Sequence, residues 1–205
     1  MAVRVQFVSE VSRVTGFAPA TWERITGYLA NAGYIPKGQP GGGIGAAHYQ
    51  VGAIASALMG GSAHVPSEAP VAVRSLENLR AHGPNSLASL SMDGKPNVFV
   101  QPGTSLRDCL EQDVLKWATP TPEMVEAFLE EKPWLSAWTL EMSPSMPFAS
   151  LSQHRKGIGW SYTTFHPDYA NLAERPPSAR RKFELTLPVL KVAGELLGVD
   201  PTFVL

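Results

Sequence analysis

The sequence has a single cysteine, Cys109, and charged residues make up only 17% of its 205 residues. One cysteine cannot build an internal disulfide framework or a cysteine-based zinc site, so a reducing, cytoplasmic environment is expected. Lys and Arg number 17 against 18 Asp and Glu, and the net charge of −1 excludes a uniformly basic protein that coats nucleic acid. A local DNA site remains compatible with this balance. Apolar residues, at 44%, suffice for a hydrophobic core.

The usual signals of catalytic and cofactor sites are also absent. There is no Gly-x-Ser-x-Gly elbow, and the glycine-rich run Gly41–Gly45 is not followed by the Gly-Lys-Ser/Thr of a phosphate-binding loop. The five histidines are scattered, and none forms a His-x-x-x-His pair. We therefore expect no enzymatic activity, no catalytic residues, no metal and no cofactor.

No segment predicts a membrane partner. Residues 38–67 contain no Asp, Glu, Lys or Arg, but their best apolar piece runs only from Val51 to Met59. A helix that spans a bilayer needs about 20 mostly apolar residues. The segment is therefore predicted to be a glycine-rich loop and a buried helix. The first residues show no signal-peptide core.

Periodicity and turn residues predict a mixed α+β chain. Helices are predicted at 4–15, 19–32, 47–59, 70–81, 104–117, 121–131 and from Pro188 to Gly198. Strands are predicted at 134–142, 146–152, 158–165 and 180–187, with a hairpin at 86–101 around Asp93-Gly94. The expected organisation is a winged helix-turn-helix module at 1–61, a linker and connecting helix at 62–85, and an α+β domain for oligomerisation or partner binding at 86–205.

The most informative segment is VSRVTGFAPATWERI, residues 11–25. Ser12 is small enough to let a second helix cross close to the first, and Gly16 suits the sharp turn between them. Phe17 can fill the angle between the helices, while Trp22 and Ile25 can face the first helix together with Val11 and Val14. The outer face of the second helix would then be free to enter a major groove of DNA.

This segment resembles the helix-turn-helix of bacterial and phage repressors. Its continuation, GYIPKG followed by a glycine loop and a helix near Tyr49, resembles the MerR-type winged helix-turn-helix over residues 5–60. The resemblance implies an N-terminal helix pair, a wing and sequence-specific binding of double-stranded DNA.

The expected DNA contacts lie mainly on the second helix. Arg24 can bind guanine through two hydrogen bonds, Glu23 can accept one from cytosine, and Thr21 can contact a base or a phosphate. Arg13, Lys37 and His48 are expected to contact phosphates, which position a protein without reading sequence. The full candidate set is Arg13, Ala20, Thr21, Glu23, Arg24, Tyr28, Lys37 and His48.

The leading hypothesis is a bacterial or phage transcriptional regulator that acts as a homodimer or higher homo-oligomer, because so few cations would bind DNA weakly as a monomer. Alternatives are a DNA-recognising subunit of a phage packaging or recombination assembly, and a structural or interaction protein that does not bind DNA. Residues 104–131 hold seven acidic and two basic residues. They form a solvated face or a surface for a protein partner.

Overall fold

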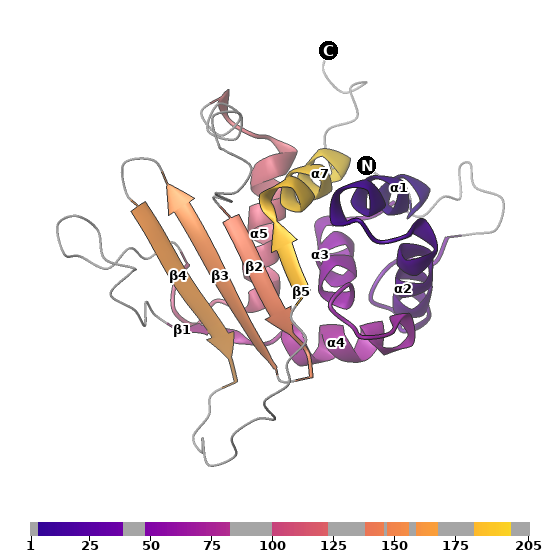
Figure 1. Ribbon diagram of the computed structural model, residues 1–205, viewed down its shortest axis with the longest axis horizontal. Coiled ribbons are helices and arrows are strands. Elements are labelled where there is room, and N and C mark those ends of the chain that lie inside the picture. Colours follow the sequence, from indigo (N-terminus) through magenta and orange to yellow (C-terminus); the bar gives the residue numbers. More distant parts are fainter. Residues whose placement is uncertain are drawn as a thin grey trace.

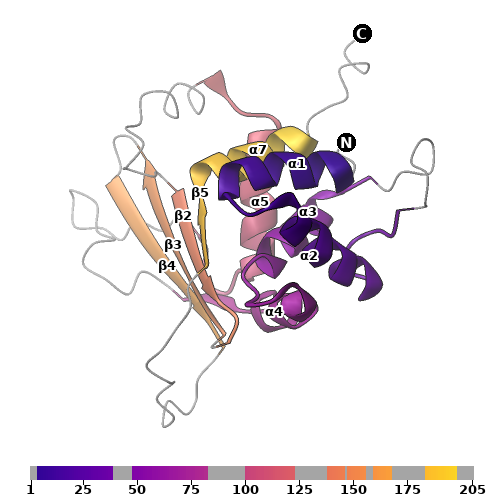
Figure 2. The same ribbon diagram turned by 45° about the vertical axis from the view of Figure 1, so that its right-hand side comes forward.

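A computed structural model of the chain describes residues 4–38, 48–82, 100–122, 138–145, 147–155, 159–167 and 183–197. These residues form a mixed α+β fold, as predicted, and its strands make one antiparallel sheet of five strands. Figures 1 and 2 show the labelled helices gathered on one side of the sheet. Among the described residues, no helix is long and apolar enough to cross a bilayer.

The first helices follow the predicted pattern closely. They are α1 (Arg4–Thr15), α2 (Pro19–Asn31) and α3 (Val51–Gly60). Proline opens α2, where its missing N–H group is harmless. Helix α3 is buried from Ala53 to Gly60, which explains why its sequence is apolar on every side. No strand element occurs among the described residues between α2 and α3, and the expected wing at residues 39–47 lies outside them.

The helix predicted at 70–81 is shorter than expected. A 3₁₀ turn, η2 (Pro66–Glu68), leads into α4 (Ala69–Leu76), and the chain then extends into strand β1 (Arg80–His82). The prediction of helix up to residue 81 was wrong because β1 pairs with a strand more than 80 residues later, Arg80 lying opposite His166. Leu79 remains buried although it leaves the helix.

The sheet has the strand order β1-β4-β3-β2-β5. Its other strands are β2 (Trp138–Ser143), β3 (Phe148–Arg155), β4 (Gly159–His166) and β5 (Phe183–Thr186). All four were predicted, with shifts of a few residues at their ends. Inward side chains alternate along β2 and β3, and Leu140 lies opposite both Leu151 and Leu185. This alternation places one apolar face against the helices.

Two further helices cover that face. Helix α5 (Leu106–Ala118) begins at Ser105, whose side chain accepts a hydrogen bond from the Asp108 amide at 3.0 Å. Helix α7 (Leu187–Leu197) packs against α5 and also against α1 (Figure 2). The predicted hairpin at 86–101, apart from its last residues, and the helix predicted at 121–131, apart from its first two, lie outside the described residues.

The buried side chains of these elements form one continuous cluster that includes α1 to α5, the sheet and α7. The predicted division of the chain at residues 61 and 85 stays a prediction. Trp22 and Phe7 from the N-terminal helices belong to the same cluster as Leu140 and Phe165 from the sheet.

Candidate functional site

A three-residue turn, Gly16 to Ala18, joins α1 to α2. Gly16 has a φ of +72°, in the left-handed region that favours glycine, and its amide donates to the Ser12 carbonyl at 3.0 Å. The predicted role of Gly16 in a sharp turn is therefore confirmed.

Thr15 organises this turn, although sequence reasoning did not identify it. Its hydroxyl donates to the Val11 carbonyl at 2.7 Å and accepts the indole N–H of Trp22 at 3.0 Å. The polar edge of a buried tryptophan needs such a partner. Thr15 thus fixes Trp22 of α2 to the end of α1, and its position four residues after Val11 was the available signal.

Aromatic contacts hold the crossing of α1 and α2. Trp22 is fully buried and meets Phe7 edge-to-face, with ring centroids 5.9 Å apart and an interplanar angle of 88°. The ring centroid of Phe17 lies 5.9 Å from that of Trp22, so Phe17 fills the angle between the helices as expected. Val11 and Ile25 are buried at the seam, and the small residue Ser12 is 7% exposed.

The outward face of α2 carries most of the candidate residues. Ala20, Glu23, Arg24 and Tyr28 are exposed, and Thr21 is half-buried. In both ribbon views α2 lies at the margin of the molecule farthest from the sheet (Figures 1 and 2). Within the described ranges, Arg24 takes part in no ion pair or side-chain hydrogen bond. The structure therefore presents these side chains together on one accessible helix face.

The three expected phosphate contacts lie apart from this face. Arg13 is exposed on α1, and its guanidinium group donates to the Glu10 carboxylate from Nε at 3.1 Å and Nη2 at 2.9 Å. Lys37 and His48 are exposed on either side of residues 39–47. Ion pairs between exposed groups are weak, so Glu10 does not prevent Arg13 from exchanging partners.

Arg4 was missed by sequence reasoning, yet it joins the two helices. Its Nε donates to the Thr26 hydroxyl at 2.9 Å, and its Nη2 donates to the Glu23 carbonyl. A groove of about 480 Å³ lies beside it and is lined by Arg4, Val5, Val8, Ser9, Pro19 and Glu23. The spacing of Arg4 to Phe7 and Val8, which places all three on one face of α1, could have identified it.

Tyr49, near which the MerR-type resemblance implies the start of a helix, is a core residue. Its ring is fully buried and lies 5.5 Å from that of Phe7. Burial raises the pKa of Tyr49 to about 12, although the Arg4 charge and the Thr26 hydroxyl act in the opposite direction. Tyr49 therefore packs against Phe7 of α1 inside the core and does not reach the surface.

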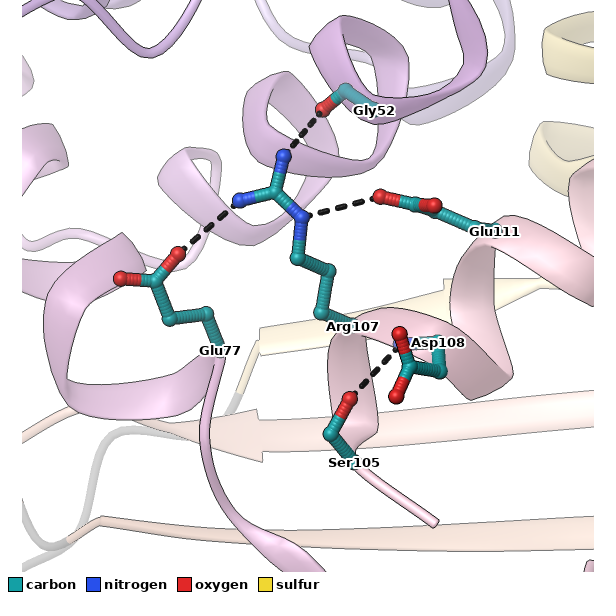
Figure 3. Close-up of polar contacts among 6 residues, drawn as sticks. All are labelled: Gly52, Glu77, Ser105, Arg107, Asp108 and Glu111. Atoms are coloured by element: carbon teal, nitrogen blue, oxygen red, sulfur yellow. Dashed lines mark hydrogen bonds and ion pairs between the residues drawn. The ribbon is translucent and has the colours of Figure 1, made fainter.

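An ion-pair cluster around Arg107 joins α3, α4 and α5 (Figure 3). Arg107 binds Glu77 through Nη1 and Glu111 through Nε, each at 2.9 Å, and its Nη2 reaches the Gly52 carbonyl at 3.5 Å. Burial would lower the pKa of Arg107, but the hydrogen bonds and charges of the two glutamates raise it above its ordinary value. The cluster therefore joins α3 and α4, which pack against α2, to α5, which covers the sheet.

Two carboxylates of the acidic region at 104–131 bind other residues of the same chain. Glu111 pairs with Arg107, and the buried Asp113 accepts from Lys116 at 2.6 Å and from the Trp138 indole at 2.7 Å. Asp108 is exposed, and residues 123–131 lie outside the described residues. The expected protein-binding surface in this region stays a prediction.

Little in the described part of the chain indicates catalysis or metal binding. The described residues include no group of three or more His, Cys, Asp or Glu side chains that could hold a metal ion. Cys109 is buried, and burial together with the charge of Asp113 raises the pKa of its thiol. The side chain behaves as a small core residue, as its sequence position predicted.

Comparisons with known proteins supply no family. No family model, no curated protein and no solved structure matches this chain.

Proposed function

We propose that this protein binds double-stranded DNA sequence-specifically through α2, in the manner of a bacterial or phage transcriptional regulator. The observation that carries the proposal is the α1–α2 pair: two helices joined by a three-residue turn, with the second helix uncovered along its outer face. Such a pair acts as a helix-turn-helix when its second helix lies in the major groove.

The dimensions and chemistry of α2 suit this role. Its 13 residues make a helix of about 20 Å, and an α-helix of 10–12 Å diameter fits a major groove about 12 Å wide. Arg24 would donate two hydrogen bonds to guanine O6 and N7. Glu23 would accept from cytosine N4, while Ala20 and Tyr28 would make apolar contacts along the groove.

Electrostatics argue for more than one copy on the DNA. The whole chain has a net charge of −1, so non-specific attraction to DNA is weak. Two copies on adjacent half-sites would combine modest affinities, and their spacing would be one helical turn of DNA or a multiple of it. The expected wing at residues 39–47, flanked by Lys37 and His48, would add backbone contacts.

The test begins with selection of bound sequences from a random DNA library by the 205-residue chain. Fluorescence anisotropy on the selected site at several salt concentrations then gives the affinity and its salt dependence. An enriched motif and a steep salt dependence are expected. No enrichment, with weak binding that is the same for every sequence, would refute the proposal.

Arg24→Ala is the decisive variant. We expect it to weaken binding to the selected site by a factor that corresponds to about 1–3 kcal/mol and to relax the preference at one base pair. Arg74→Ala is the matched control, because Arg74 is an exposed arginine on α4 and its loss removes the same charge. If both variants weaken all sequences equally and leave the motif unchanged, Arg24 does not read a base. Light scattering of the complex separates a dimeric regulator from the large oligomer of a packaging or recombination assembly.

A further inference from the structure

Arg4, the first residue of α1, is hydrogen-bonded to α2 through its guanidinium group. Two of its five N–H groups donate to α2, one to the Thr26 hydroxyl and one to the Glu23 carbonyl. The other three N–H groups have no partner among the described residues. Two hydrogen bonds therefore hold a positive charge with spare donors beside α2 before any ligand arrives, which reduces the entropy lost on binding.

The position of Arg4 around α2 follows from helical geometry. Successive residues are rotated by about 100°, so relative to Glu23 the exposed residues Ala20, Arg24 and Tyr28 lie at about 60°, 100° and 140°. Thr26, which is buried, lies at about −60°. Arg4 contacts α2 at Thr26 and Glu23, and its Nη2 lies 3.3 Å from the position that a Cβ atom would take on Gly27, at about 40°, so Arg4 lies along the Glu23 border of the exposed face.

A charge at that border is suited to the DNA backbone. When the second helix of such a pair lies in the major groove, the first helix crosses the phosphates that flank the groove. Arginine matches the geometry of phosphate oxygens with paired N–H groups. The groove beside Arg4, about 480 Å³ in volume, leaves this side of the α1–α2 seam open to a ligand.

We infer that Arg4 is a phosphate-binding residue that positions α2 on DNA and reads no base. This inference rests on the proposed function and adds a residue to the same interface. Through its two bonds to α2, Arg4 would fix the distance between one backbone phosphate and the bases that Arg24 faces.

The first test compares Arg4→Gln with wild type on the selected site. We expect affinity to fall roughly tenfold or more for every sequence, since a charge-assisted hydrogen bond is lost. The slope of log K against log salt should decrease by about 1, and the base preference should stay unchanged. A salt slope equal to that of wild type would overturn the inference.

Two matched variants separate charge from packing. Arg4→Lys keeps the charge and should retain the salt slope, although it loses the planar group that bonds Thr26 and Glu23 together. Thr26→Val removes the acceptor of the Arg4 Nε bond and keeps the charge. If Arg4 only packs α1 against α2, Thr26→Val and Arg4→Gln should weaken binding alike, with the same salt slope.

A scan of the DNA locates the phosphate contacts of the wild-type protein, and the Arg4 variants then show which of these contacts belongs to Arg4. Each backbone phosphate of the selected site is replaced in turn by a neutral methylphosphonate. At one position per half-site, neutralisation should weaken binding by wild type and by Arg4→Lys, and should have little further effect on Arg4→Gln. If no position shows this coupling while Arg24→Ala still relaxes the motif, the inference about Arg4 is wrong and the proposed function stands. If wild type selects no motif, both fail.

Discussion

Gly194 of α7 faces the backbone of α5 at a distance that leaves no room for a side chain. A Cβ atom at this position would lie 2.4 Å from Trp117 Cβ and 2.5 Å from the Trp117 carbonyl carbon. Carbon atoms normally pack 3.5–4.0 Å apart, so the two helices would have to separate by about 1 Å. Overpacking of this kind in a well-packed core costs about 1–3 kcal/mol or more.

Helix propensity acts in the opposite direction and must be subtracted. Alanine is about 0.8–1.0 kcal/mol more favourable than glycine inside a helix. Because the clash involves the main chain of Trp117 and the amide of Ala118, rotation of a side chain cannot relieve it. We therefore take the upper end of the overpacking cost, about 3 kcal/mol, and after subtracting the propensity gain expect Gly194→Ala to destabilise the protein by about 2 kcal/mol.

Gly27→Ala is the matched control. Gly27 also lies inside a helix, but the nearest atom to an added Cβ is the Arg4 Nη2, at 3.3 Å, which belongs to a flexible side chain. The propensity gain should dominate there, with a stabilisation of up to about 1 kcal/mol. The two substitutions are chemically identical, and only the packing around them differs.

The assay is urea denaturation followed by far-ultraviolet circular dichroism, with the free energies of unfolding compared at equal m-values. Thermal melting should show a decrease of roughly 4–8 °C for Gly194→Ala, given the 2–4 °C per kcal/mol typical of a chain this long. If Gly194→Ala proves as stable as Gly27→Ala, then α5 and α7 do not approach each other as closely as described.

Two further substitutions test the support of α2. Trp22→Ala should destabilise the protein by about 3–5 kcal/mol in the same denaturation assay, because Trp22 is fully buried, and a cost below 1 kcal/mol would place its ring outside the core. Tyr49→Phe concerns pH: the folded-state pKa of about 12 exceeds the ordinary value of 10, so the stabilisation from a neutral Tyr49 is complete below pH 10 and is lost as pH rises from 10 to 12. The variant should show a flatter decrease in stability over that range, and a decrease as steep as that of wild type would contradict this role of Tyr49.

Local patterns in the sequence predicted the elements that depend on local contacts. Gly16 and Pro19 mark the boundary between α1 and α2, and apolar spacing identifies the buried faces of both helices. Alternation revealed β2 and β3, whose inward side chains fill the core. The same reasoning extended the helix at 70–81 too far, because its last residues pair with β4 instead.

The contacts that organise the site were beyond local patterns because they join distant residues. Arg107 binds Glu77 and Gly52, which precede it by 30 and 55 residues. Arg4 reaches Thr26 across 22 residues. Each of these arginines is an ordinary charged residue in the sequence, and only the crossing of helices reveals which backbone or side-chain oxygens it meets.

These long-range contacts make the presentation of α2 depend on the rest of the fold. Phe17 of the turn contacts Phe183 of β5, with ring centroids 5.6 Å apart, and α1 packs against α7. Helices α3 and α4 pack against α2, and Arg107 of α5 binds Gly52 of α3 and Glu77 at the end of α4. A fragment of residues 1–61 would expose the apolar faces of α1 and α3 that α7 and α5 now cover. Loss of DNA binding by that fragment would therefore not contradict the proposal that α2 binds DNA. Arg24 and Arg4 should therefore be compared in variants of the whole 205-residue chain, in which the elements that pack against α1 and α3 are present.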